Sequence, residues 1–95
     1  MTTITISKSS IKIRGHAGYA PCGQDIVCAG ITALTQTLIG SLEKLTRDKI
    51  TYEISPGRAD IYYKDLTKEG KLLVESFLIG VRYIADEFSD YVKIN

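Results

Sequence analysis

The spacing of apolar residues changes several times along this 95-residue chain, and these changes limit the folds that it can adopt. Apolar and polar residues alternate in TITIS and in IKIR, and the polar segment SKSS separates them, which predicts a β-hairpin. From Asp25 onward the apolar residues recur every three or four positions, which predicts a helix ending near Thr46 or Arg47. Its expected buried residues are Val27, Ile31, Leu34, Leu38, Leu42 and Leu45.

The second half of the chain repeats this order of patterns. KITYEIS and ADIYYK alternate, and between them SPGR suits a type II turn, because Pro56 fixes φ and Gly57 accepts a positive φ. A second helix is predicted from a cap at Thr67 to about Phe88, and the closing YVKIN could add a short edge strand. In the first of these strands Ile50, Tyr52 and Ile54 share a face, and in the second Ala59, Ile61 and Tyr63 share one. Tyr52 and Tyr62, on neighbouring strands, are either ordinary sheet residues or part of a dimer surface. The predicted buried stripe of the second helix is Leu73, Phe77, Val81, Ile84 and Phe88.

These elements predict an α+β fold with the order ββαββα and a possible C-terminal strand. Hairpins imply antiparallel pairing, and two amphipathic helices can cover one face of a sheet of about four strands. We therefore expect a two-layer structure. A chain of this length supports one hydrophobic core, so residues 1–95 are expected to form a single domain.

Charge and hydropathy narrow the expected partners and location. Twelve basic and eleven acidic residues are interspersed, as in EKLTRDK, and no clustered basic surface favours nucleic-acid binding. The first residues, MTTITISKSS, contain no apolar signal segment, and no uninterrupted apolar run approaches about 18 residues. We therefore expect a cytoplasmic protein with no membrane or nucleic-acid partner, in which both cysteines are free thiols.

The segment GHAGYAPCGQDIVCAG contains the only histidine and both cysteines of the chain. His16 follows a predicted strand, and Cys28 would be the third residue of a helix that Asp25 caps. The N–H groups at a helix start and a nearby imidazolium lower the pKa of a thiol. The free N–H groups could also stabilise an oxyanion. This placement favours cysteine-dependent acyl transfer, a reaction that needs no cofactor.

Other interpretations of these residues stay open. A free cysteine in a first helical turn is often a small core residue, and a lone histidine is often structural. The chain would then be a non-catalytic homodimeric module that binds a peptide. A zinc site is not expected, because His16, Cys22 and Cys28 are six residues apart and lack a fourth ligand. Cys22 is most simply a loop residue.

The loop 17–23 lies between the two reactive residues. It could close over a substrate segment and exclude water, or it could simply connect the strand to the helix. The residues that would contact substrate in the first case are Gly18, Tyr19, Pro21 and Cys22. Asp25 also has two possible roles, as the helix cap or as a partner that orients His16. The spacing favours the cap.

The stretch GHAGYAPCGQDIVCAGITAL closely resembles the signature of the ribosomal-processing cysteine proteases, the Prp family. The resemblance implies that His16 and Cys28 form a catalytic dyad and that Gly23 and Asp25 belong to the conserved motif. Gly30 and Thr32 differ from the usual alanine and serine, and Thr32 keeps a hydroxyl one helical turn beyond Cys28.

The resemblance also implies an α+β homodimer that cleaves a protein substrate. Family members remove an N-terminal extension from ribosomal large-subunit protein number twenty-seven, and phage-encoded relatives are thought to process capsid or scaffold proteins. The differences at Gly30 and Thr32 leave the choice between these substrates open.

Overall fold

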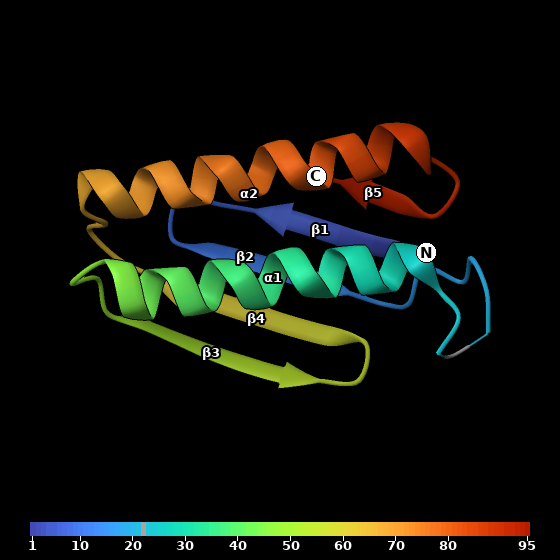
Figure 1. The fold of residues 1–95 in the computed structure, drawn as a ribbon, viewed down its shortest axis with the longest axis horizontal. Coiled ribbons are helices and arrows are strands. Elements are labelled where there is room, and N and C mark those ends of the chain that lie inside the picture. Colours follow the sequence, from blue (N-terminus) through green and yellow to red (C-terminus); the bar gives the residue numbers. More distant parts are fainter. Residues whose placement is uncertain (22) are drawn as a thin grey trace.

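The computed structural model describes residues 1–21 and 23–95, and it has two layers, a sheet and two helices that cover one of its faces (Figure 1). The two-layer α+β prediction and its order ββαββα are confirmed, and the short C-terminal strand is present. The bounds are β1 Thr2–Ile6, β2 Ser10–Arg14, α1 Ile26–Leu45, β3 Ile50–Ser55, β4 Arg58–Tyr63, α2 Lys68–Glu87 and β5 Val92–Ile94.

The sheet has five strands in the order β3-β4-β2-β1-β5 and is mixed rather than wholly antiparallel. The two hairpins, β1–β2 and β3–β4, are antiparallel, and β2 joins them by pairing with β4. Strand β5 pairs in parallel with β1. The reason is that α2 runs opposite to β1, so the reversal after α2 makes the chain return in the direction of β1 (Figure 1).

The core lies between the helices and the inner face of the sheet. Helix α1 buries Thr35 and Ile39 in place of the predicted Leu34, which is half-buried, and Leu45, which is 71% exposed. Leu45 is the last helical residue, where the chain turns away. The buried apolar residues are Ile4, Ile11, Ile13, Ala17, Val27, Ile31, Leu38, Ile39, Leu42, Ile61, Tyr63, Val74, Phe77, Val81 and Val92.

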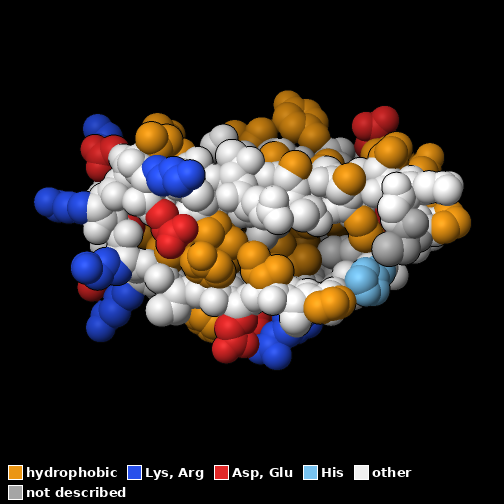
Figure 2. Space-filling view, turned by 60° about the horizontal axis from the view of Figure 1, so that its bottom comes forward, with side chains coloured by type: hydrophobic (Ala, Val, Ile, Leu, Met, Phe, Trp, Pro, Cys, Tyr) orange, Lys and Arg blue, Asp and Glu red, His pale blue; other side chains and the backbone are white. Residues whose placement is uncertain are grey.

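Strand β3 is more exposed than the rest of the inner face of the sheet. Tyr52 and Ile54 pair with Ile61 and Ala59, so they lie on the inner face. They are nevertheless exposed, and β3 is one of the two edge strands. Figure 2 shows apolar side chains along a hollow on this side of the molecule, with His16, the only histidine, at one end.

Helix α1 has 20 residues, and an 18-residue window of it has a mean hydropathy of 1.4, so by length and composition it is apolar enough to span a membrane. The sequence expectation concerned uninterrupted apolar runs, and threonine, glutamine and serine interrupt this one. Core helices pass the same test. The side chains of Val27, Ile31, Leu38 and Leu42 belong to the core, so we interpret α1 as a core helix.

An ion-pair cluster fixes β2 against β4 on the face of the sheet that the helices do not cover. Asp60 is fully buried, and its carboxylate accepts hydrogen bonds from Arg14 and from Arg58 Nε at 2.9 Å. The Arg14 hydrogen bond, followed by that of Arg58, holds the pKa of Asp60 below its ordinary value despite the burial. Arg14 and Arg58 are also register partners, so this cluster places the end of β2 beside the β3–β4 turn.

Candidate active site

The two residues singled out in the sequence lie on either side of the loop between β2 and α1. His16 is exposed and comes two residues after β2 ends. Cys28 is half-buried in the first turn of α1. The backbone N–H of Ala17 donates a hydrogen bond to Cys28 Sγ at 3.2 Å. Because Ala17 directly follows His16, this bond holds the sulfur beside the backbone that carries the imidazole.

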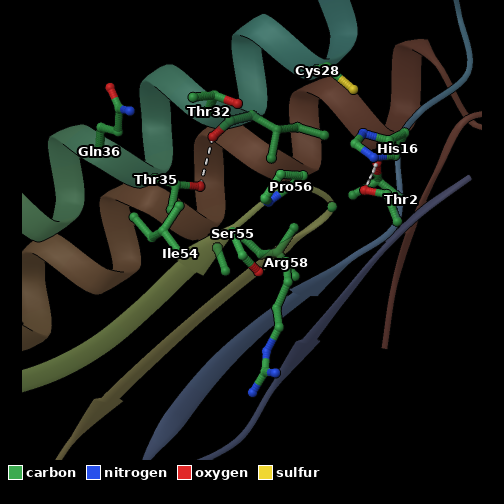
Figure 3. Close-up of a pocket in the computed structure, with 15 residues that line it drawn as sticks. Thr2, His16, Cys28, Thr32, Thr35, Gln36, Ile54, Ser55, Pro56 and Arg58 are labelled. Atoms are coloured by element: carbon green, nitrogen blue, oxygen red, sulfur yellow. Dashed lines mark hydrogen bonds between the residues drawn. The ribbon is translucent and has the colours of Figure 1, made fainter.

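His16 and Cys28 line the same cavity, which has a volume of about 240 Å³ (Figure 3). Its other walls are the start of β1, the inner side of α1 and the β3–β4 turn. The lining residues are Thr2, Ile13, Gly15, His16, Cys28, Ile31, Thr32, Thr35, Gln36, Ile54, Ser55, Pro56, Gly57, Arg58 and Ala59. A wider hollow of about 800 Å³ also includes His16 and Cys28, together with Gly18, Gly23 and Asp25.

Asp25 caps α1, as its position in the sequence predicted. Its Oδ1 accepts hydrogen bonds from the N–H groups of Val27 and Cys28, both at 3.0 Å. Its Oδ2 accepts from the N–H groups of Tyr19, at 3.0 Å, and Ala20, at 3.4 Å. One carboxylate therefore fixes both the start of the helix and the preceding loop. Neither oxygen bonds His16.

The same bonds occupy two of the N–H groups at the helix start that were expected to be free to stabilise an oxyanion. The N–H groups of Val27 and Cys28 both donate to Asp25, so a substrate oxygen would have to compete with a carboxylate for them. The N–H of Ala17 is the donor that reaches the sulfur instead. From the sequence, Asp25 was expected to cap the helix and the N–H groups of its first turn were expected to be free. The two expectations conflict, because the cap binds those N–H groups.

Thr32 lies one turn beyond Cys28, and its side chain is exposed. It lines both cavities, as does Gln36 a further turn along. The neighbouring Thr35 is buried and donates its hydroxyl to Ile31 O at 2.7 Å. Both threonines line the smaller cavity, but Thr35 is buried with its hydroxyl bonded to Ile31, whereas Thr32 is exposed one turn from Cys28.

The loop before α1 packs against the C-terminal part of the chain through Tyr19. The ring of Tyr19 packs edge-on against Phe88, with centroids 5.4 Å apart, and against Tyr91, at 5.3 Å. Gly18 and Gly23 have positive φ and line the wider hollow. Pro21 is exposed. The predicted substrate contacts by Gly18, Tyr19 and Pro21 stay predictions, and Cys22 lies outside the described residues.

Comparison with known proteins identifies this arrangement. A family profile described as "Cysteine protease Prp" matches residues 1–93. This chain belongs to that family. It is a cysteine protease, and the family assignment favours the enzyme over the non-catalytic peptide-binding module.

The Prp relatives cover most of the chain. The ribosomal processing cysteine protease Prp of Staphylococcus aureus is 29% identical over 84 residues, which span 85% of this chain and 79% of the relative. The Bacillus subtilis protein of the same description is 24% identical over 92 residues, which span 90% and 82%. Both relatives are described as processing proteases of the ribosome.

Solved structures agree with the fold. The S. aureus Prp protease, crystallised with a covalently linked product peptide, superposes with a TM-score of 0.90 at 24% identity, covering 99% of this chain and 95% of that one. A structure from Streptococcus mutans gives a TM-score of 0.80 at 28% identity, covering 99% and 90%. The mixed sheet and two-helix layer are thus shared with Prp.

The β3–β4 turn is the part of this cavity that sequence reasoning missed. SPGR was recognised as a turn, but nothing in it suggested a site, because Ser55, Pro56 and Gly57 carry no obvious catalytic group. The turn reaches the cavity only because β4 pairs with β2, which places Gly57 beside Gly15. The one feature of the sequence that could have drawn attention to this turn is its Pro-Gly pair.

A metal site finds no support in the described part of the chain. Across residues 1–21 and 23–95, no three histidine, cysteine, aspartate or glutamate side chains gather closely enough to hold an ion.

Two substitutions of Asp25 separate its role as the helix cap from its role in holding the preceding loop. Asparagine is also a good helix cap, so Asp25→Asn should keep the bonds from Val27 and Cys28 but place an amide NH₂ where Oδ2 accepted from the loop. Asp25→Ala removes all four bonds. We expect Asp25→Ala to lower the melting temperature by roughly 5 °C and Asp25→Asn by less, as measured by thermal unfolding. Equal losses for both variants would contradict the capping role.

The pH dependence of stability follows from the same bonds. The N–H of Cys28 foremost, with those of Ala20, Tyr19 and Val27, holds the pKa of Asp25 below its ordinary 3.8. The ionised carboxylate therefore stabilises the fold above pH 3.8, and this contribution is lost as the pH falls through the lower pKa of the folded state. We expect denaturant titrations to show a smaller loss on acidification for Asp25→Asn than for the wild type. An identical acid profile would contradict this.

Proposed function

We propose that Cys28 is the nucleophile of this protease and that His16 is its general acid and base. The single observation that carries the proposal is the hydrogen bond from Ala17 N–H to Cys28 Sγ, which holds the sulfur at a cavity that His16 also lines. A thiolate next to an imidazole can attack an acyl group without a cofactor.

The reaction proceeds in two steps. The Cys28 thiolate attacks the carbonyl carbon of the scissile peptide bond, the C–N bond breaks, and His16 donates its proton to the leaving amine. The product is a thioester on Cys28. A water molecule then attacks the thioester carbon while His16 takes its proton, and the C–S bond breaks to release the acid and the thiolate.

Thr32 and the loop support this chemistry in the proposal. The Thr32 hydroxyl faces the cavities one turn from Cys28, where it can donate to the substrate carbonyl oxygen. Asp25 acts indirectly, because its carboxylate sets the position of Cys28 N and of the loop at Tyr19. Gly18, Pro21 and Cys22 complete the substrate-facing loop.

The substrate that we propose is ribosomal large-subunit protein number twenty-seven with an N-terminal extension. The curated relatives are described as ribosomal processing proteases, which supports this choice. The cavity also accepts an apolar side chain, because Ile13, Ile31 and Ile54 line it. Such an enzyme would act in the cytoplasm, where ribosomal proteins are made.

Incubation with the extended ribosomal protein tests the substrate directly. We expect cleavage at a single site near its N-terminus, seen by intact mass, and no cleavage by Cys28→Ala. Phage capsid or scaffold precursors are incubated in parallel. Cleavage of those precursors alone would replace the ribosomal substrate with a phage one.

We also propose that the protein forms a homodimer through the outer face of α2. Leu72, Ile79 and Tyr83 form an apolar stripe there and are 67%, 56% and 73% exposed. Glu75 and Arg82 flank the stripe on either side of Ile79 along the helix. In an antiparallel pair of α2 helices with the two-fold axis near Ile79, Glu75 of one copy would face Arg82 of the other. The charges that flank the stripe are therefore complementary between two copies of the protein.

The dimer is tested by placing a charge at the centre of the stripe. We expect sedimentation equilibrium to give a dimer for the wild type and a monomer for Ile79→Glu, because a buried unpaired carboxylate opposes association. Leu45→Glu is the control, since it charges another exposed aliphatic residue, at the end of α1, and should remain dimeric. A wild-type monomer or a dimeric Ile79→Glu would contradict this interface.

A further inference from the structure

Among residues 1–21 and 23–95, no protein group makes a hydrogen bond to the His16 imidazole. The acid nearest in the sequence, Asp25, uses both of its oxygens for the N–H groups of the loop and helix. The contact that the structure shows for the ring is one of packing.

The surface against which the ring packs is Gly57. A Cβ at this position would lie 3.0 Å from His16 Nε2, 3.5 Å from Cδ2 and 3.6 Å from Cε1. The edge of the imidazole that carries Nε2 thus faces the bare Cα of Gly57. Gly57 also has φ +70°, a conformation that suits glycine.

The turn that carries Gly57 is fixed from two directions. Gly15 N–H donates to Gly57 O at 2.8 Å, so the residue before His16 is bonded to the turn itself. Arg58, directly after Gly57, pairs with Ser55 in β3 and with Arg14 in β2. The turn is therefore a rigid surface held at a set distance from the backbone of His16.

We propose that Gly57 is the positioning residue for His16, doing by packing what a carboxylate partner does for the histidine of other hydrolases. This inference rests on the proposed role of His16 as general acid and base. A Cβ at position 57 would approach Nε2 more closely than an ordinary contact, so the imidazole would have to move by a few tenths of an ångström. Because a displacement of about 1 Å can cost about 10²-fold in rate, we expect this smaller shift to lower kcat by roughly 3- to 10-fold.

Two substitutions separate displacement of the ring from strain in the turn. Gly57→Ala adds a Cβ and a strained φ, whereas asparagine tolerates positive φ, so Gly57→Asn adds the Cβ with less strain. Gly40→Ala is the matched control, because a Cβ there meets nothing within 4 Å and Gly40 lies outside both cavities. Cleavage of the extended ribosomal protein is measured with melting temperatures. Both Gly57 variants should lose kcat, with KM changing less, while Gly40→Ala should match the wild type.

The single histidine gives a readout that does not depend on activity or on a variant. In the wild-type protein, nuclear Overhauser contacts are expected between the imidazole ring protons and the Gly57 Hα protons. The ring resonances should shift in Gly57→Asn and stay in place in Gly40→Ala. Absence of the wild-type contacts, or a Gly57→Asn with wild-type resonances and kcat, would overturn the positioning role.

The two proposals fail in different ways. If His16→Ala cleaves at the wild-type rate, the catalytic role of His16 is wrong, and the positioning role falls with it. If His16→Ala is inactive while Gly57→Asn cleaves normally, only the role of Gly57 is wrong.

Discussion

Cys28→Ser is expected to reduce cleavage by on the order of 10⁴-fold or more while the protein stays folded. A serine hydroxyl is close in size to the thiol and can accept the same hydrogen bond from Ala17 N–H. It is far less nucleophilic, because the neighbouring imidazole would have to remove a proton from an alcohol. The substitution therefore removes the chemistry and keeps the packing. Turnover of the extended ribosomal protein and the melting temperature are the two measurements.

The control for this variant is the other cysteine of the chain. Cys22→Ser removes the only other thiol but no nucleophile, so cleavage by this variant should persist, with any change expected in KM because Cys22 is placed in the substrate-facing loop. Wild-type cleavage by Cys28→Ser, or loss of cleavage only in Cys22→Ser, would show that the nucleophile has been assigned to the wrong residue.

Gly15→Ala should produce a large loss of stability. A Cβ at Gly15 would lie only 2.4 Å from the carbonyl oxygen of Met1, which is backbone and cannot rotate away. Gly15 also has φ +86°, and its N–H bonds Gly57. We expect a loss of at least about 2 kcal/mol of unfolding free energy, or roughly 10 °C in melting temperature.

The matched substitution for this test is Gly40→Ala. It replaces a helical glycine with space around it, so helix propensity should leave stability unchanged or raise it by up to about 1 kcal/mol. Chemical denaturation of both variants measures the difference. Equal stability of Gly15→Ala and the wild type would mean that the start of β1 does not press against Gly15.

Local patterns in the sequence predicted the parts of the fold that depend on neighbouring residues. Asp25 and Thr67 cap the helices as expected, since a cap needs only the next few N–H groups. Gly30 lets α2 approach α1 closely, because a Cβ there would lie 3.2 Å from Ile84. The positive φ of Gly57 followed from the Pro-Gly pair.

Features that depend on distant pairing could not be read in this way. The parallel direction of β5 and the exposure of Ile54 depend on where each strand lies in the sheet. The contact of Gly57 with His16 depends on the register of β2 with β4. The sequence did not reveal that the N–H groups of Val27 and Cys28 are occupied, for a different reason. Asp25 was recognised as the residue that caps the helix, but a cap accepts hydrogen bonds from these same N–H groups and leaves them unavailable to a substrate.

The most direct test of the central assignment is to capture the acyl-enzyme. The wild-type protein is mixed with the extended ribosomal protein, quenched in acid during turnover, and examined by intact mass and peptide mapping. If Cys28 is the nucleophile, a thioester adduct of the cleaved segment is expected on Cys28, and this adduct should form more slowly in His16→Ala. An adduct on another residue, or steady cleavage with no adduct and no effect of His16→Ala, would contradict it.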